Sequence, residues 1–156
     1  MAVVGAAWAA KKEIVLISPE DLKWVDVPAP PGAPANPAGG AQVANVKGDA
    51  FKGAYSAFAK IPAGQVHPLH THSSDVTAVV VSGTFTVTPE GGAEKKLGPG
   101  SYFMVPGGTK HLSGCAAGAP CVVFQMGPAK FDMKPVAEKA EKAEKTEKTE
   151  KKPAAK

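Results

Sequence analysis

The fold of this 156-residue chain is decided by GQVHPLHTHSSDVTAVVVSG at residues 64–83 and by GSYFMVPGGTKH at residues 100–111. Together they hold every histidine of the chain, namely His67, His70, His72 and His111. On a strand, His70 and His72 project to the same face about 7 Å apart, so their rings can converge on one ion. An isolated pair at this spacing is also typical of exposed polar residues in a loop. The pair alone therefore leaves both readings open.

His111 follows two or three strands after the pair and supplies the missing third group. Three imidazoles from neighbouring strands form a facial set that suits a divalent Zn, Fe, Ni, Cu or Mn ion. Such a set leaves positions open for water or substrate. His70, His72 and His111 are therefore candidate metal ligands, with exposed polar histidines as the alternative.

The rest of the chain indicates one all-β domain. Its 17 Gly and 15 Pro favour many short elements over long helices. Turn residues recur between short β-branched or aromatic runs, a spacing typical of a sandwich or barrel. The expected strands are Glu13–Ile17, Lys23–Val27, Val43–Lys47, Ala54–Ile61, Val76–Val81, Thr84–Pro89, Ser101–Val105, Lys110–Ser113 and Cys121–Met126.

Charge and hydropathy argue against nucleic acid as a partner and against a membrane span. All 18 basic residues are Lys, which removes the guanidinium best suited to phosphate and base recognition. Most of the net charge of +4 lies from residue 134 onward, so the folded part carries no basic face for nucleic acid. No run of 18 apolar residues is present, so we expect no membrane span.

The glycines and prolines around the histidines form a pattern together with them. Gly64, two His and Gly83, followed by Gly100, Pro106, Gly108 and His111, resemble the two motifs of the cupin superfamily. This resemblance implies a small RmlC-like jelly-roll β-barrel over residues 50–133 with a metal in its mouth. More narrowly, the chain looks like a group of small single-domain bacterial cupins whose activities are mostly unassigned.

The sequence departs from the cupin pattern at two positions. Cupins usually place a Glu three or four residues after the second His, where this chain has Val76 and Thr77. The nearest acid is Asp75, which reaches the site only if Ser73 and Ser74 form a bulge. Asp75 is therefore a candidate fourth ligand, with a surface turn acid as the alternative.

The second departure is a cysteine at the position of the usual Asn. Cys115 is either a thiol near the metal or half of a disulfide with Cys121, across a five-residue loop of hairpin-like spacing. The disulfide is expected if the compartment is oxidising. His67, on the opposite parity to His72, is expected beside the metal rather than on it. Tyr102 and Gln125 are further candidate pocket residues.

Two functions fit these residues. The first is an enzyme of dioxygenase, isomerase or decarboxylase type that binds a small molecule at the open metal positions. That small molecule is either neutral or anionic. The alternative is a non-catalytic metal or ligand sensor, like the C-terminal cupin of anti-sigma factors. The resemblance also implies a homodimer paired through an N-terminal arm at Glu13–Val27.

The two ends of the chain carry their own expectations. Residues 1–10 resemble the end of a secretory signal, which would place the protein in the periplasm or outside the cell; without one it is cytoplasmic. A full signal would require a true start upstream of Met1. Residues 11–49 are read as an arm and a Pro/Gly-rich loop. Residues 134–156 repeat Lys and Glu with few apolar residues, so we expect a solvated, partly helical or disordered tail.

Overall fold

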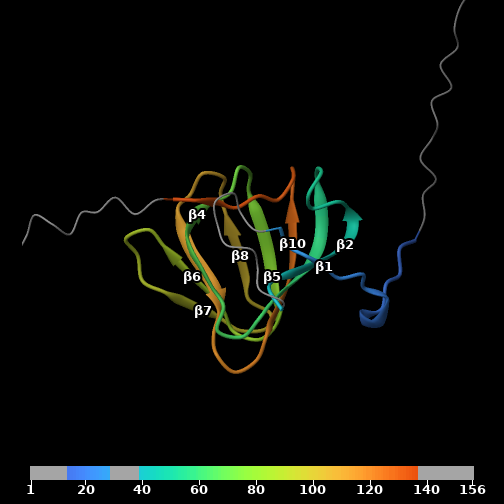
Figure 1. Ribbon diagram of the computed structural model, residues 1–156, viewed down its shortest axis with the longest axis horizontal. Coiled ribbons are helices and arrows are strands. Elements are labelled where there is room, and N and C mark those ends of the chain that lie inside the picture. Colours follow the sequence, from blue (N-terminus) through green and yellow to red (C-terminus); the bar gives the residue numbers. More distant parts are fainter. Residues whose placement is uncertain (1–13, 29–38, 137–156) are drawn as a thin grey trace, which may run out of the picture.

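Two antiparallel sheets face each other in a jelly roll (Figure 1). The computed structural model describes residues 14–28 and 39–136. The signal-like residues 1–10 and most of the Lys/Glu segment lie outside the described residues. Within the described part, only one 3-10 turn, η1 (Pro19–Asp21), accompanies the strands.

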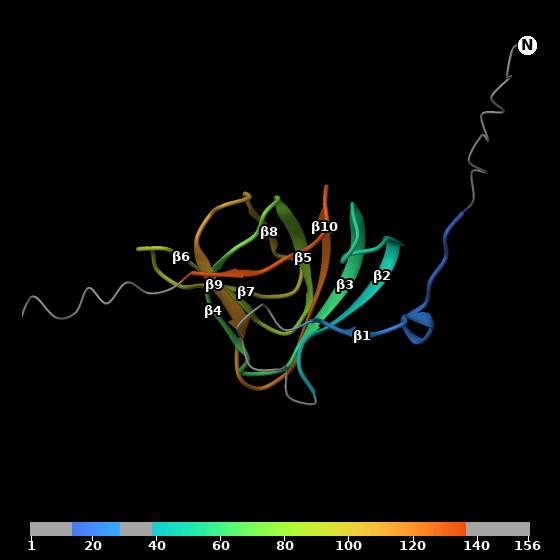
Figure 2. The same ribbon diagram turned by 45° about the horizontal axis from the view of Figure 1, so that its top comes forward.

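Sheet A has six strands and sheet B has five. In spatial order, sheet A contains β1 (Val25–Asp26), β2 (Gln42–Gly48), β3 (Tyr55–Ile61), β10 (Cys121–Gly127), β5 (Val76–Ser82) and β8 (Tyr102–Val105). Sheet B contains β11 (Lys134–Pro135), β4 (Val66–Thr71), β9 (His111–Cys115), β6 (Phe85–Pro89) and β7 (Lys95–Leu97). Figure 2 shows the strands of the two sheets wrapping around a common interior.

The interior is filled by alternate residues of strands from both sheets. On β3, every second residue is buried, beginning with Tyr55 and ending with Ile61. Phe85 from sheet B stacks on Phe103 from sheet A with ring centroids 5.0 Å apart. Since burial of such side chains is the main stabilising term of a small domain, this alternation joins the two sheets into one core.

A disulfide between Cys115 and Cys121 joins the end of β9 to the start of β10. It therefore links sheet B to sheet A. Of the two alternatives that the sequence left open for these cysteines, the structure contains the bridge. Both residues are buried in the core, and Cys115 is not offered to the metal.

Eight of the nine predicted strands are found in the two sheets, and one is not. The predicted strand Glu13–Ile17 is absent over residues 14–17, which are exposed and paired with no other strand. Three strands, β4, β7 and β11, were not in the predicted set. Each lacks the usual β pattern, since β4 contains Pro68 and the two others are rich in Lys.

The two sheets also extend beyond the residues 50–133 that the sequence assigned to the barrel. Strand β2 pairs along β3 from Gln42 onward, and β11 pairs Lys134 and Pro135 with β4. Within the described residues, no helix has the length and apolar character needed to cross a bilayer.

Candidate metal centre

A bulge in β4 sets the direction of the histidines. In the pairing of β4 with β9, His67 lies opposite Ser113 and His70 opposite His111, so three steps on β4 match two on β9. The extra residue falls next to Pro68, which has no N–H to donate to the ladder. The bulge changes the alternation, so His67 and His70 both face the interior although they are an odd number of residues apart.

Three imidazoles meet in front of this bulge. One ring nitrogen each from His70, His72 and His111 lies within 4.8 Å of the other two, and all three side chains are buried. The His70 ring centroid is 4.2 Å from that of His111 and 5.0 Å from that of His72. The spacing is close enough that small side-chain adjustments bring all three nitrogens onto one ion.

Hydrogen bonds from the backbone fix which nitrogen each ring offers. The Nδ1 atoms of His70, His72 and His111 lie 2.7, 2.5 and 3.0 Å from the carbonyl oxygens of Pro68, Asp132 and Thr109. A carbonyl only accepts, so each Nδ1 carries the proton and donates it. Each Nε2 is then an unprotonated donor of a lone pair, as metal-binding histidines usually are.

The residues present fit a divalent metal ion. The Nε2 atom of His70 is buried and has no hydrogen-bond partner in the described structure. A buried polar atom without a partner is costly, and an ion at this position removes that cost. The donor set of three neutral imidazoles is one that Zn, Fe, Ni, Cu and Mn accept.

Burial keeps these imidazoles in the neutral form that a metal needs. Burial lowers the pKa of His70 to about 4, against a smaller raising effect of the hydrogen bond to Pro68. Burial also lowers the pKa of His72, against a smaller raising effect of the hydrogen bond to the Asp132 carbonyl. Near neutral pH, His70 and His72 therefore need not lose protons before an ion binds.

His67 lies beside the cluster but is not part of it. The Gln65 amide Nε2 lies 3.3 Å from Nε2 of His67, and an amide nitrogen can only donate, so this ring nitrogen accepts. Nδ1 then carries the proton and donates to Ser113 Oγ at 3.2 Å. Burial lowers the pKa of His67 to about 4. Both of its nitrogens are thus engaged by protein groups.

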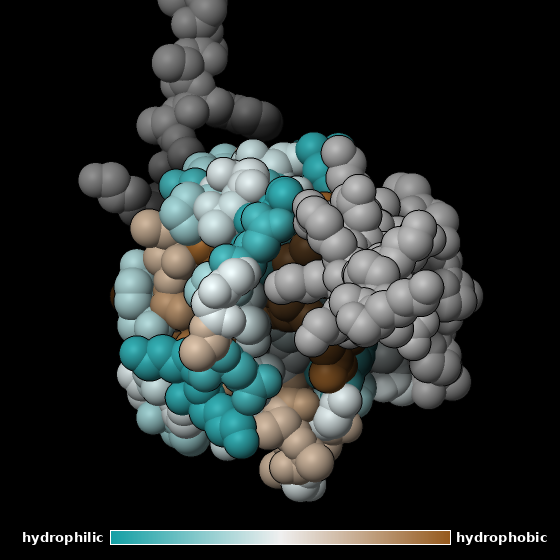
Figure 3. All heavy atoms as spheres, turned by 90° about the vertical axis from the view of Figure 1, so that its left-hand side faces the viewer, coloured by the Kyte–Doolittle hydropathy of each residue, from teal (hydrophilic) through white to brown (hydrophobic). Residues whose placement is uncertain are grey.

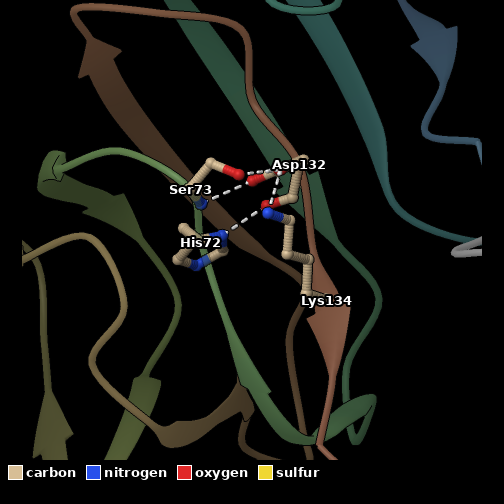
Figure 4. Close-up of polar contacts among 4 residues, drawn as sticks. All are labelled: His72, Ser73, Asp132 and Lys134. Carbon is tan, nitrogen blue, oxygen red and sulfur yellow. Dashed lines mark hydrogen bonds and ion pairs between the residues drawn. The ribbon is translucent and has the colours of Figure 1, made fainter.

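The segment that follows β10 closes over the outer side of His72. Besides its carbonyl contact to His72, Asp132 accepts hydrogen bonds from the Ser73 backbone N–H and hydroxyl, and Lys134 Nζ lies 3.8 Å from it (Figure 4). Phe131 packs on the His72 ring with centroids 5.1 Å apart. The role of this segment could not be predicted from the sequence, because any residue type can supply a backbone carbonyl.

The cluster opens into a cavity between the two sheets. Its volume, counted as the space open to the centre of a water molecule, is about 80 Å³. Thirteen of its nineteen lining residues are apolar, and the others are the four histidines, Ser113 and Gln125. On the side where β4, β6 and β7 lie, Figure 3 shows apolar atoms recessed behind hydrophilic ones. The expectation that Gln125 lies in the pocket matches this placement.

Two of the candidate site residues lie elsewhere. Asp75 is exposed, and its carboxylate accepts a hydrogen bond from the Gly107 N–H at 2.8 Å, outside the cluster. The bulge lies before His70, and Ser73 and Ser74 form a bend between β4 and β5 that leaves Asp75 outside the cavity. Tyr102 is 63% exposed, because β8 turns Phe103 and Val105 inward instead.

Comparison with known proteins agrees with this geometry. The family model described as "Cupin domain" matches residues 57–126, which include all three clustered histidines. This match identifies residues 57–126 as a cupin domain. No curated protein matches the sequence of this cupin at a significant level.

Solved structures share the fold of this cupin. The polyketide cyclase RemF from Streptomyces resistomycificus is 17% identical, with 82% of this chain and 89% of RemF covered and a TM-score of 0.64. KdgF from Halomonas sp. is 25% identical, covering 72% of this chain and 91% of KdgF with a TM-score of 0.54. The anti-sigma ChrR, solved with Rhodobacter sphaeroides SigE, is 20% identical, covering 70% of this chain and 50% of that chain with a TM-score of 0.51. At identities under 25%, such likeness establishes the fold alone.

Proposed function

We propose that this cupin is an enzyme that acts on a small organic molecule with a divalent metal held by His70, His72 and His111. The observation that carries the proposal is the convergence of three unprotonated Nε2 atoms on the wall of an apolar cavity. A metal-binding face that adjoins a ligand-sized cavity is the usual arrangement of a metalloenzyme site. A purely structural ion needs no such space.

The metal and the protein contribute different things to this site. When bound, a divalent ion on three neutral ligands keeps its full charge and supplies the Lewis-acid or redox chemistry of the dioxygenase, isomerase and decarboxylase classes. The protein holds the three imidazoles in one tautomer through backbone carbonyls. Its apolar walls limit the access of water, which strengthens electrostatic interactions inside the cavity.

Elemental analysis of protein purified without a metal-binding tag tests the proposal. We expect one equivalent of a divalent transition metal per chain, and loss of that equivalent in His70→Ala and His72→Ala. His67→Gln and Asp75→Asn are the matched controls and should keep the metal, because neither side chain belongs to the cluster. No metal after reconstitution, or full occupancy in His70→Ala, contradicts the proposal.

The identity of the metal then selects the activity screen. Iron directs the search to oxygen consumption with candidate substrates, whereas zinc, nickel or manganese directs it to isomerase and decarboxylase assays. Turnover that requires the metal and disappears in His72→Ala supports an enzyme. Tight binding of small molecules without turnover supports the second candidate below.

The second candidate is a metal or ligand sensor. It is favoured by the lining itself, because no Asp, Glu, Lys or Tyr is among the described residues around the cavity. A general acid or base would therefore have to be an imidazole. ChrR, the anti-sigma protein named above, has a related fold.

We also propose that two chains pair through the N-terminal arm. The support is the exposure of Ile14, Val15 and Leu16, at 89%, 61% and 87%, an unusual run of apolar surface for a single chain. Sedimentation equilibrium should give a dimer mass for the native chain and a monomer mass for Leu16→Glu. A native monomer at micromolar concentration contradicts this pairing.

The disulfide bears on where the protein resides. Such bridges persist in oxidising compartments, so the Cys115–Cys121 link supports a periplasmic or secreted location. Mass analysis of the native protein after alkylation without reduction should find no free thiol. Two alkylated cysteines would support a cytoplasmic location instead.

A further inference from the structure

The cavity lining is largely apolar and offers few polar groups. Its apolar residues come from both sheets, such as Val123 on β10 and Val87 on β6. The polar lining outside the three metal-binding imidazoles consists of His67, Ser113 and Gln125. A polyhydroxylated molecule would lose most of its hydrogen bonds to water here without replacing them.

Gln125 is a buried amide that lacks a protein partner. The residue lies at the centre of β10, is 7% exposed and lines the cavity. Among the described residues its side chain forms no hydrogen bond, and its amide atoms stay accessible from the cavity, where both donors and an acceptor are available. A strand position between Ala57 and Ala78 of the neighbouring strands would accept an apolar side chain more easily. An amide at this place indicates a ligand that it contacts.

Ser113 is oriented by its neighbours so that its hydroxyl can donate. His67 Nδ1–H donates to Ser113 Oγ at 3.2 Å, and Gln65 fixes this tautomer from the other side of the ring. With one lone pair of Oγ engaged, the hydroxyl proton of Ser113 remains to be given to another acceptor. Since Ser113 lines the cavity, that acceptor belongs to whatever occupies it.

We infer that the ligand of this cavity is a compact, mainly apolar molecule with one oxygen-bearing group, which Gln125 and Ser113 bind. This assignment rests on the proposed function in that it concerns the cavity beside the metal centre. It goes further, because it names the ligand class and the two residues that select it. Aromatic or branched aliphatic alcohols and carbonyl compounds belong to that class; sugars do not. An acidic group would find no Lys among the described lining residues, and only the metal as a cation.

Three probes of simple chemistry test the ligand class on the purified, metal-containing protein. p-Cresol has an apolar ring and one hydroxyl, p-xylene replaces that hydroxyl with a methyl group, and glucose is polyhydroxylated. Titrations followed by backbone amide shifts in NMR give a dissociation constant for each. We expect p-cresol to bind at least about tenfold more tightly than p-xylene, and glucose to cause no shifts. Equal binding of glucose and p-cresol overturns the assignment.

Two variants separate the roles of the protein from those of the metal. Gln125→Leu and Ser113→Ala should each weaken p-cresol about threefold to tenfold and leave p-xylene unchanged. Gln42→Leu is the matched control, since the Gln42 amide bonds Asp26 at the surface and is absent from the cavity lining. Ser56→Ala, on a strand face away from the cavity, is the control for Ser113→Ala.

A stability measurement distinguishes a ligand-binding amide from one with a structural role. Because the Gln125 amide faces the cavity and no protein group needs it, Gln125→Leu should leave the Tm of the ligand-free protein unchanged or higher while weakening p-cresol. A lower Tm, or unchanged p-cresol binding in both variants, overturns the inference.

Failure of this inference and failure of the proposed function give different results. If the chain holds one equivalent of metal but binds neither ring compound, the ligand class is wrong and the metal centre stands. If the chain holds no metal but binds p-cresol through Gln125, the ligand assignment stands and the metalloenzyme proposal fails.

Discussion

His72 Nδ1 lies 2.5 Å from the carbonyl oxygen of Asp132, sixty residues further along the chain. The contact ties one member of the histidine cluster to a segment that lies outside both cupin motifs. The Asp132 side chain keeps that segment in place through two hydrogen bonds from Ser73, the residue next to His72. The position of His72 therefore depends on the end of the barrel as well as on its own strand.

We predict that Asp132→Ala weakens metal binding by about 10-fold to 100-fold, the usual effect of losing a group that supports a ligand. Without the carboxylate, the segment is free to move away from Ser73, and its carbonyl no longer holds the His72 ring. Asp132→Asn retains an acceptor for one of the two Ser73 contacts, so this variant should lose less metal affinity than Asp132→Ala. Competition between the protein and a chelating dye for zinc measures the zinc affinity of both variants.

Glu90→Ala is the control for this series. Glu90 also forms an ion pair, with Lys110 at 3.0 Å, but it is exposed and lines no part of the cavity. Its replacement should leave zinc affinity unchanged. An equal loss in Glu90→Ala, or no loss in Asp132→Ala, would show that the Asp132 segment does not position His72.

Removing the disulfide should lower stability without removing the metal. The bridge closes a short loop, with a sequence separation of 6 residues, and loop-closure entropy assigns such a bridge about 2–3 kcal/mol. The double variant Cys115→Ser with Cys121→Ser should lose at least that much in the free energy of unfolding. Urea denaturation measures the loss, and elemental analysis of the same sample should still find one metal per chain. Loss of the metal would instead show that the bridge is needed to shape the site.

The sequence predicts those parts of the site that depend on residue type and spacing, and not those that depend on strand pairing. The three clustered histidines were found because their spacing and the Gly and Pro residues around them form a pattern that few other folds need. The bulge beside Pro68 could not be predicted in the same way. It arises from the pairing of β4 with β9, so the inward direction of His67 is a property of two strands.

The wrong predictions have similar causes. Tyr102 and Phe103 are adjacent aromatic residues on one short strand, and the sequence does not decide which of them faces inward. Residues 14–17 are apolar, and three of the four are β-branched, but no strand lies beside them in the single chain, and a strand needs a partner. The contribution of Asp132 is made by its backbone, so its residue type did not reveal it.

Two glycines with nearly the same backbone angle should respond differently to alanine. Gly64 and Gly83 have φ values of 76° and 78°, a region that costs a residue with a Cβ about 1–2 kcal/mol. A Cβ on Gly64 meets nothing within 4 Å, whereas one on Gly83 lies 2.7 Å from the Pro120 carbonyl oxygen. Gly83→Ala should therefore lose clearly more unfolding free energy than Gly64→Ala in urea denaturation. Equal losses would mean that the backbone at Pro120 moves away from the new Cβ without a loss of stability.

The stability of the metal-free protein should fall as the pH is lowered from about 6.5 to about 4. In the unfolded chain an imidazole takes up a proton near its ordinary pKa of about 6.5. In the folded chain burial lowers the pKa of His67 and of His70 to about 4. Between these values the unfolded state binds more protons, so protonation favours unfolding. The stability is fully present above about pH 6.5 and is lost as the pH falls through about 4.

The size and origin of this loss can be measured by urea denaturation at a series of pH values. A shift of this size corresponds to on the order of 3 kcal/mol for each imidazole. His67→Gln removes one titrating group without removing a cluster member, so its stability should decline less steeply with falling pH than that of the native chain. If both proteins keep the same unfolding free energy from pH 7 to pH 4.5, these imidazoles are not buried in the neutral form. Saturating zinc should reduce the decline near pH 6, because an ion that binds only the folded state adds stability and competes with protons for the same nitrogens.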